Sequence, residues 1–412
     1  PHRTHTQPSK KPILFGTNGA SLLPAIRESF ESSKSPQMNS SMSKSLELKA
    51  FFHLLECGMW NTPPDMSFSW NNVDWVCILH LSMEQGVVGL IADGISKLPT
   101  ALRPPKRVFV NMVMSVKGIE DDSDRALNMA MAVQSYLSQN QVETLIIKGV
   151  GMARNYPNPR HRVVGDIDLL TDSNLDSFEK GRQLLRQIAS KEEFDVDEER
   201  RHVAFDIKNQ LVELHGLIGS FVNKESEEFV REWATHHLST SPVVWHLSKA
   251  DIKLPPYQFD AIYIFLHFFH HFVGAACGLR QLCDWVLFLD KHGDKVDVGV
   301  LRNDLEKMKL MRAWQIFASV AVNYLGMPKE KMLLYDRSGD KDCRKAVLAV
   351  IKANHNLAKL RKKNKNGKKM AALLQHAKSF IHLIPTYYVN LKVFPHETIY
   401  SLKNYILSRL RE

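Results

Sequence analysis

Two aspartates spaced two residues apart are the clearest chemical signal in the chain. Asp166 and Asp168 interrupt an otherwise apolar run from Val163 to Leu170, which is typical of a β-strand. Residues i and i+2 of a strand point to the same face, so the two carboxylates would lie side by side. Two like charges at a partly buried position are costly unless a cation lies between them. Because Mg²⁺ commonly binds one or two carboxylates together with substrate phosphates, the pair predicts a divalent-metal site.

A simpler interpretation is that the aspartates only end a strand at the protein surface. The residues before the pair favour the metal site. A short strand is expected at Val142–Ile147, followed by Lys148 and Gly149 at the start of about one turn of helix. Free backbone N–H groups at such a turn favour phosphate, and Lys148 could bind a β- or γ-phosphate. The alternative for this pair is an ordinary strand-to-helix turn with a surface lysine.

A later pair of predicted strands carries another carboxylate. Arg201–Ile207 and Gln210–Leu217 are predicted to form a β-hairpin with a tight turn at Lys208-Asn209. The two-residue period places Glu213 and His215 on one face of the second strand.

The segment Leu145–Leu170 resembles the DNA polymerase β-type nucleotidyltransferase superfamily, whose signature is a strand, a Gly-containing turn and helix, and an Asp-x-Asp strand. It is most similar to an uncharacterised bacterial nucleotidyltransferase family with a Leu-Lys-Gly element, a tyrosine, an arginine four residues before the first aspartate, and Asp-Ile-Asp-Leu-Leu. The chain carries these elements at Lys148, Gly149, Tyr156, Arg162 and Asp166–Leu170. Lys-Gly replaces the usual Gly-Ser of the superfamily, and the gap to the first aspartate is longer, although both features match the narrower family.

The resemblance implies a role for each site residue. Asp166 and Asp168 would bind both Mg²⁺ ions, which Mn²⁺ can replace, and Glu213 would lie beside the ion nearer the acceptor and assist deprotonation. Glu213 stands where the family more often has aspartate, so only the reach of the side chain differs. The residues expected to bind the nucleotide are Lys148, Gly149, Arg162 and His215.

Other candidate side chains have structural alternatives. Arg160 competes with Arg162 as a clamp for the triphosphate, and either could be a surface residue. Arg280 and Asp284, on a predicted helix, could line the acceptor cleft or pair with each other as i,i+4 neighbours, and the pairing is favoured. Three histidines at helical spacing lie in an aromatic run, which favours a packed helix over a zinc site. They are His267, His270 and His271.

Composition narrows the class of protein. A chain of 412 residues with 44% hydrophobic and 24% charged residues is ordinary for a globular protein of two to three domains. Five scattered cysteines without a Cys-x-x-Cys pair favour a reducing compartment and argue against structural zinc. No apolar run is long enough to span a bilayer and no signal-type segment follows Pro1, so a cytoplasmic protein without membrane association is expected.

The excess of basic over acidic residues also bears on which partners the protein binds. The net charge of +10 suits either a nucleic-acid partner or an enzyme that handles nucleoside triphosphates. The excess is concentrated in the segment Lys359–Lys369. A run of this density is more often a solvated loop than a binding site, and the alternative is a loop that binds RNA. No partner protein is indicated.

Periodicity predicts an α+β fold in which a small mixed β-sheet is flanked by N-terminal and C-terminal helical domains. The long helix opened by Pro104 and Pro105 is expected to break at the charged run Glu120–Asp124, and an earlier helix to stop at Gly58. Beyond Asn223 only helices are expected, at 224–238, 257–273, 278–291, 298–308, 311–325, 342–354, 369–383 and 398–411. The expected divisions are a disordered segment 1–44, a helical domain 45–140, a nucleotidyltransferase core 141–222 and a helical domain 223–412.

These observations predict a Mg²⁺-dependent nucleotidyltransferase. It would move a nucleoside monophosphate from an NTP, with ATP as the expected donor, to an acceptor and release pyrophosphate. The acceptor is not identified by the sequence. An RNA 3′ end such as that of tRNA, as in toxin-like members, is favoured by the basic balance over a small molecule or a protein side chain. The alternative is an inactive module that binds nucleotide or RNA, but such a module has no need for three clustered carboxylates.

Overall fold

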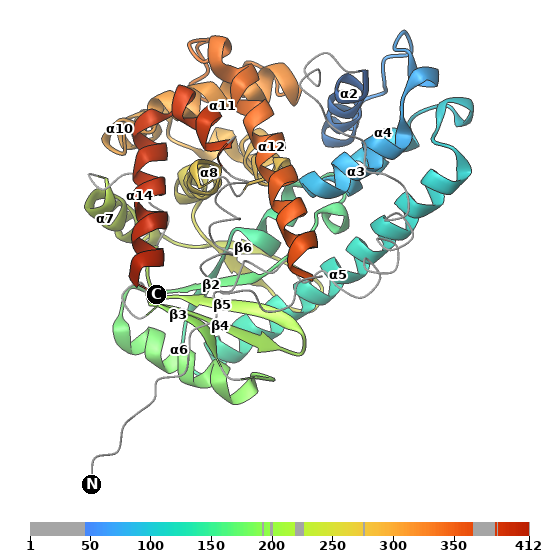
Figure 1. Ribbon diagram of the computed structural model, residues 1–412. Helices are drawn as coiled ribbons and strands as arrows, with labels where there is room; N and C mark the ends of the chain where they lie inside the picture. The colour runs from blue at the N-terminus through green and yellow to red at the C-terminus, as the bar shows by residue number, and fades with distance from the viewer. Residues whose placement is uncertain are drawn as a thin grey trace.

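The computed structural model describes residues 46–191, 193–197, 201–218, 226–274, 277–365, 384 and 386–411. The fold is α+β, as predicted, with a five-stranded mixed sheet and α-helices before and after it (Figure 1). The predicted disordered segment 1–44 lies outside the described residues, as does the helix expected at 369–383. Among the described residues, no helix combines the length and the apolar character that a membrane crossing requires.

Among the residues that the structure describes, four α-helices precede the sheet, together with the short 3₁₀ turns η2 (Trp70–Asn72) and η3 (Thr100–Leu102). They are α2 (Leu46–Trp60), α3 (Trp75–Gln85), α4 (Val88–Ser96) and α5 (Lys106–Gln139). The predicted stop at Gly58 was wrong, because α2 continues to Trp60. A Cβ atom at Gly58 would lie 1.9 Å from the carbonyl oxygen of Leu90, so the glycine lets α2 and α4 pack at close range. The absence of a side chain at Gly58 therefore allows the two helices to pack closely and does not end the helix.

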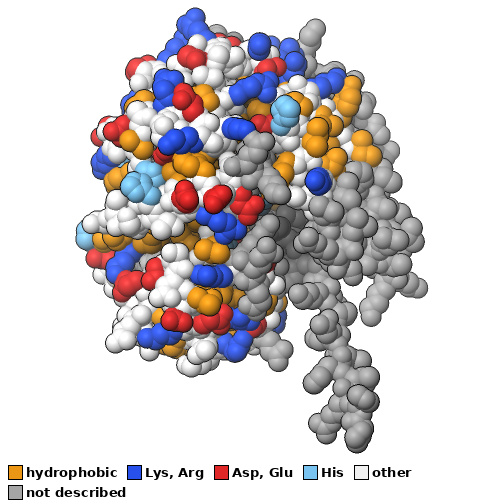
Figure 2. All heavy atoms as spheres, turned by 90° about the vertical axis from the view of Figure 1, so that its left-hand side faces the viewer, with side chains coloured by type: hydrophobic (Ala, Val, Ile, Leu, Met, Phe, Trp, Pro, Cys, Tyr) orange, Lys and Arg blue, Asp and Glu red, His pale blue; other side chains and the backbone are white. Residues whose placement is uncertain are grey.

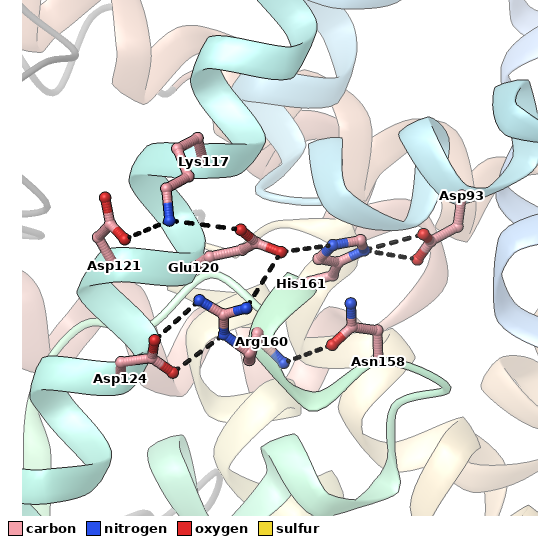
Figure 3. A network of polar contacts seen from close by, with 8 residues as sticks. All are labelled: Asp93, Lys117, Glu120, Asp121, Asp124, Asn158, Arg160 and His161. Carbon is pink, nitrogen blue, oxygen red and sulfur yellow. Dashed lines mark hydrogen bonds and ion pairs between the residues drawn. The ribbon is translucent and has the colours of Figure 1, made fainter.

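The long helix α5 runs without a break, so the expected interruption at Glu120–Asp124 was also wrong. The acidic residues of this run are neutralised instead of breaking the helix. Within α5, Lys117 binds Asp121 at 2.8 Å and Arg125 binds Asp122. Further ion pairs join the same run to a loop before the Asp-x-Asp pair (Figure 3).

The sheet has the strand order β1-β2-β5-β4-β3, in which β2 and β5 are parallel and the other neighbours are antiparallel. Its strands are β1 (Thr144–Ile147), β2 (Ile167–Thr171), β3 (Phe194–Asp197), β4 (His202–Ile207) and β5 (Gln210–His215). The predicted strand Val163–Leu170 was right only in part, because β2 begins at Ile167 and Asp166 lies just before it. Strand β3 was not expected. Helix α6 (Leu175–Ile188) follows β2, with Asn174 capping its N-terminus.

The two faces of the sheet pack against different cores. One face packs on α5 and α6 through the residues Ile146, Ile167, Leu169, Val203, Phe205, Val212 and Leu214. The opposite face contributes Ile147 and Leu170 to a larger core that it shares with the N-terminal and C-terminal helices. Because side chains alternate along a strand, Asp168 points to this second face, as do Glu213 and His215. The polar residues of the site are therefore enclosed between the sheet and the helical part of the molecule.

The C-terminal region is mainly helical. Its helices are α7 (Glu227–Leu238), α8 (Tyr257–Val273), α9 (Leu279–His292), α10 (Val298–Lys307), α11 (Met311–Tyr324), α12 (Asp340–Lys365) and α14 (Pro395–Arg411), with the 3₁₀ turn η6 (Gly293–Lys295) after α9. Most of the predicted helices are confirmed to within a few residues. The expected loop Lys359–Lys369 was wrong in its first part, because α12 continues through Lys365. Lys, Arg and Leu, which dominate this stretch, are good helix formers.

The expectation of helices alone beyond Asn223 was wrong. Strands β6 (Val243–Trp245) and β7 (Ile252–Leu254) form an antiparallel pair. Ile252 and Leu254 are fully buried in the core on the α5 face of the main sheet. The amide of Gln134, on α5, bonds the backbone of Lys253 on β7 through both of its polar atoms, at 2.8 and 3.1 Å. The small sheet therefore belongs structurally with the larger one.

Candidate active site

Parallel pairing of β2 with β5 brings the three predicted carboxylates together. Asp168 lies directly opposite Glu213 in the register, and Asp166 lies one residue before β2. One carboxylate oxygen from each of Asp166, Asp168 and Glu213 lies within 4.8 Å of the other two. The three carboxylates can therefore act on one ligand or one pair of ligands.

The hairpin of β4 and β5 forms the other side of the site, and its two-residue turn fixes the register of these strands. Lys208 and Asn209 have φ angles of 51° and 64°, so both adopt the left-handed conformation of a type I′ hairpin turn. The register that follows from this turn places His202 on β4 opposite His215 on β5. His202 was missed in the sequence, although counting outward from the predicted turn pairs it with His215. His202 Nε2 lies 3.4 Å from Oε2 of Glu213, so a fourth polar side chain joins the site.

Asp168 is the most enclosed of the three acids, with 1% of its side chain exposed. Its Oδ1 forms an ion pair with Nζ of Lys148 at 2.9 Å and lies 3.1 Å from Nε2 of His215. Its Oδ2 is buried and has no hydrogen-bond partner among the described residues. A buried carboxylate oxygen without a partner is costly, and a divalent cation would satisfy it. The donor set therefore fits a metal ion bound by oxygen ligands.

The pKa values show how strongly the site groups interact. Burial and the charge of Asp168 raise the pKa of Asp166 to about 6. Burial would also raise the pKa of Glu213, but hydrogen bonds from His202 and His215 and the charge of Lys148 lower it below its ordinary value. Burial opposes the charged forms of Lys148 and His215, yet the neighbouring carboxylates raise the pKa of both. Cationic side chains thus balance the crowded acids.

The turn after β1 lies at Lys148 and Gly149, as predicted, but its backbone conformation is uncommon. Lys148 has φ 49° and ψ −151°, a conformation that costs a non-glycine residue energy, and Gly149 follows with φ 48°. A Cβ atom at Gly149 would lie 3.2 Å from the carbonyl oxygen of Asp166. The short 3₁₀ helix η4 (Gly149–Asn155) begins here. The backbone of the turn therefore lies close to Asp166, and the Lys148 ammonium forms an ion pair with Asp168.

Arg162 does not reach the acidic cluster as a free cation. It is 4% exposed and forms a bidentate ion pair with Asp284 on α9, with Nε–Oδ1 and Nη2–Oδ2 distances of 2.8 and 2.7 Å. The hydroxyl of Tyr156 also donates to Oδ1 of Asp284, at 2.8 Å. The predicted pairing of Arg280 with Asp284 was wrong, because Arg162 and Tyr156 occupy that carboxylate and Arg280 donates to the carbonyl of Val163 at 3.0 Å. The segment before Asp166 is thus tied to α9.

The same segment is held from its other side by a network of charges (Figure 3). Arg160, in the 3₁₀ turn η5 (Pro159–His161), binds Asp124 at 2.8 Å and Glu120 at 3.5 Å, both on α5. His161 lies 2.9 Å from Asp93 on α4 and 3.5 Å from Glu120. Burial opposes protonation of His161, but these two carboxylates raise its pKa. The side chain of Arg160 is directed to α5 and not to the acidic cluster.

Helix α8 lies across the sheet face that carries the acids (Figure 1). Burial and the charge of Lys148 lower the pKa of His267 well below its ordinary value, and burial with His270 and Lys148 lowers that of His271 to about 3. The rings of His267 and His271 contact each other edge to face, with centroids 4.4 Å apart. None of these histidines belongs to a group of described residues whose ligand atoms lie close enough together to hold a metal ion.

Comparison with known proteins bears on the same segment. A model of a protein family described as an uncharacterised nucleotidyltransferase matches residues 71–326, which is more than half of the chain. The match includes the whole sheet, the acidic cluster and helix α9. No curated protein and no solved structure matches the chain. The chain therefore belongs to the uncharacterised nucleotidyltransferase family.

Proposed function

We propose that this enzyme transfers a nucleoside monophosphate from an NTP to an acceptor, with Mg²⁺ as the metal and pyrophosphate as the second product. The observation that carries the proposal is the set of three carboxylates whose ligand atoms lie within 4.8 Å of one another, in a chain that belongs to a nucleotidyltransferase family. Asp166, Asp168 and Glu213 would hold the Mg²⁺, which would supply positive charge against the phosphates during transfer.

In the transfer, the acceptor oxygen forms a bond to the α-phosphorus of the NTP. The bond from that phosphorus to the α,β-bridging oxygen breaks, and pyrophosphate leaves with the electron pair. We assign Asp166 and Asp168 to holding both metals, and Glu213 to the acceptor side, where it assists removal of the acceptor proton. Burial opposes ionisation of Glu213, but hydrogen bonds from His202 and His215 hold its pKa below the ordinary value, so it is ionised as a metal ligand must be.

Lys148 is proposed to serve the donor. Its ammonium lies on Asp168 at 2.9 Å, where it balances the charge that a metal would also balance. A long and flexible side chain at this turn can exchange Asp168 for a β- or γ-phosphate oxygen. Gly149 leaves the backbone open for close approach of the same phosphates.

Arg162 is assigned a positioning role in place of the triphosphate clamp expected from the sequence. Both of its outer nitrogens and its Nε are engaged, two by Asp284 and one by the carbonyl of Val163 at 3.2 Å. Removing it from Asp284 to bind phosphate would leave a buried carboxylate unpaired, which is costly. It therefore orders the approach to Asp166.

The acceptor and the donor base are left to experiment, with RNA and ATP as the favoured pair. The net charge of +10 supports an RNA acceptor in general terms. On the face in Figure 2, Lys and Arg side chains are interspersed with Asp and Glu side chains, so the coloured residues form no continuous basic track there. Any RNA contact is expected elsewhere, with the basic stretch Lys359–Lys369 as the first candidate.

Incubation with each radiolabelled NTP, Mg²⁺ and separate pools of cellular RNA, protein and metabolites tests the proposal. Label from one NTP should enter one pool, and the Asp166→Ala protein should transfer none. A label that enters no pool, or enters equally with the Asp166→Ala protein, would contradict the proposed activity. Transfer to protein or metabolite in place of RNA would retain the activity and reject the RNA preference.

A further inference from the structure

A second group of potential metal ligands adjoins the carboxylate cluster and shares one residue with it. It consists of His202, Glu213 and His215, whose ligand atoms all lie within 4.8 Å of one another. Nε2 of His202 and Nε2 of His215 lie 3.4 and 3.5 Å from the same oxygen of Glu213, Oε2. Both imidazoles therefore approach the carboxylate with the ring nitrogen that points away from the backbone.

The hairpin fixes this arrangement. His202 and His215 are direct partners across β4 and β5, and their ring centroids are 4.8 Å apart. Ala204 is the partner of Glu213 in the same register. The side chains of all three donors are mostly enclosed, with exposed fractions of 17% for His202, 16% for His215 and 5% for Glu213.

The chemistry of this group differs from that of the three carboxylates. Mg²⁺ prefers oxygen ligands in octahedral geometry and usually keeps several waters. Two imidazole nitrogens and one carboxylate are a donor set that suits zinc, and imidazole in general suits first-row transition ions. Two ions in neighbouring positions can share a bridging carboxylate, as in two-metal sites where the ions lie about 3.5–4 Å apart.

We propose that His202, Glu213 and His215 bind a divalent first-row transition ion, so that the acceptor-side metal position is a mixed nitrogen and oxygen site. The neighbouring Mg²⁺ position rests on the proposed function, but the ligand set of the transition ion does not require it. Glu213 would belong to the acceptor position, and Asp168, whose Oδ1 lies 3.1 Å from Nε2 of His215, would be shared with the donor position. The enzyme would then combine an all-oxygen donor site with a more strongly binding acceptor site.

The competing explanation is that the two histidines are only counter-ions. His215 also lies 3.1 Å from Oδ1 of Asp168, so a protonated ring would bind two carboxylates. Metal ligation requires neutral imidazole and a free lone pair on each Nε2, whereas a counter-ion requires a proton there. The two explanations therefore differ in whether nitrogen coordinates a metal.

Metal alone is the probe, added to the full chain without nucleotide. Titration with Co²⁺ is followed by its visible d–d absorption, and Mn²⁺-loaded protein is examined by pulsed electron paramagnetic resonance for coupling to imidazole ¹⁴N. The unmodified protein should bind Co²⁺ at one site and show this ¹⁴N coupling. Coupling only to solvent protons, or no bound ion, would overturn the proposal without recourse to any variant.

Variants then assign the ligands. His202→Ala should weaken Co²⁺ binding at least about tenfold and reduce the ¹⁴N coupling, since loss of a ligand costs at least as much as loss of a supporting contact. His246→Ala is the matched control, because His246 has 80% of its side chain exposed and lies outside the site. Equal Co²⁺ affinity and equal ¹⁴N coupling in the His202→Ala and wild-type proteins would reject the site.

One further variant separates this inference from the proposed function. Asp166→Asn removes a carboxylate of the Mg²⁺ site but leaves the group of His202, Glu213 and His215 intact. It should lose nucleotidyl transfer and retain the ¹⁴N coupling. If the wild-type protein shows no transfer with any acceptor but binds Co²⁺ in a manner that depends on His202, the metal site stands and only the proposed reaction fails.

Discussion

Arg162 and Asp284, which are 122 residues apart in the sequence, form a buried bidentate ion pair. The arginine is four residues before the first aspartate of the acidic cluster, and the aspartate is on helix α9 of the C-terminal region. The hydroxyl of Tyr156 donates to the same carboxylate. The ion pair therefore fixes the segment that carries Asp166 relative to helix α9. The C-terminal helical region thereby helps to set the geometry of the proposed metal site.

We expect Asp284→Asn to destabilise the protein by about 3–5 kcal/mol, because it leaves the buried guanidinium of Arg162 without its counter-charge. Urea-induced unfolding at fixed pH measures the effect. Lys331→Gln is the control, since it removes an ion pair to Asp290 whose lysine side chain is 52% exposed, and it should barely change the unfolding midpoint. Similar midpoints for both variants would show that the buried pair has no special structural role.

Asp260 provides a prediction about pH. It is fully buried on α8, neither carboxylate oxygen has a hydrogen-bond partner among the described residues, and burial raises its pKa to about 8. Between about pH 4 and pH 8 the folded protein keeps this proton and the unfolded chain loses it, so the contribution to stability falls as pH rises. Asp260→Asn has no such proton to lose. Its free energy of unfolding relative to wild type should therefore rise by on the order of 1 kcal/mol per pH unit from pH 5 to pH 8.

The control for Asp260 is Asp251→Asn, at a side chain that is 54% exposed. Its stability relative to wild type should stay nearly constant over the same pH range. Chemical unfolding at several pH values compares the two variants. A constant difference between Asp260→Asn and wild type would show that the carboxyl group is already ionised in the folded state.

Glu213→Gln should lower the transfer rate by orders of magnitude and change NTP affinity little. The donor-side metal would keep Asp166, Asp168 and the phosphates, whereas the acceptor side would lose its charged carboxylate. Single-turnover kinetics measure the rate, and equilibrium binding of the NTP with Mg²⁺ measures the affinity. Glu193→Gln is the control, because this glutamate binds Arg182 at 2.7 Å away from the cluster. Equal losses in rate and affinity would assign Glu213 to donor binding.

The basic segment Lys359–Lys369 gives a prediction about RNA. If it binds RNA phosphates, affinity should fall steeply with salt, since each neutralised phosphate contributes a log–log slope of roughly −0.7 to −0.9. Changing Lys362, Lys363, Lys365, Lys368 and Lys369 to Gln should flatten that slope by several units and leave NTP binding unchanged. Discrimination between RNA sequences should change little, because phosphate contacts carry no sequence information. An unchanged slope would remove this segment as an RNA contact.

The sequence predicted the acidic cluster because each of its parts is local. Alternation along a strand places Glu213 and His215 on one face, and the tight turn at Lys208-Asn209 aligns β4 with β5. Pairing of β2 with β5 could not be counted from any turn, since the strands are parallel and separated by α6, β3 and β4. The proximity of Asp168 to Glu213 therefore rested on the family resemblance until the register was known.

Two errors in the sequence interpretation have a common cause, which is that a polar residue has a partner in the folded chain that the sequence does not reveal. The sequence alone suggests that Arg162 binds phosphate, whereas in the structure it forms an ion pair with Asp284. The sequence alone suggests that the acidic run of α5 breaks the helix, whereas in the structure Arg160 and His161 pair with its carboxylates. Strands β6 and β7 have three residues each, too few for an alternating pattern, and they form only because their edge packs beside β1 and α5.

Pyrophosphate release is the most direct test of the central claim, that Asp166, Asp168 and Glu213 form a catalytic metal site. The wild-type protein, supplied with NTP, acceptor pool and Mg²⁺, should release pyrophosphate, and chelation of the metal should stop it. Asp168→Asn should release none, while Asp172→Asn, at the exposed residue that follows β2, should match wild type. Release by the Asp168→Asn protein at the wild-type rate would contradict the account.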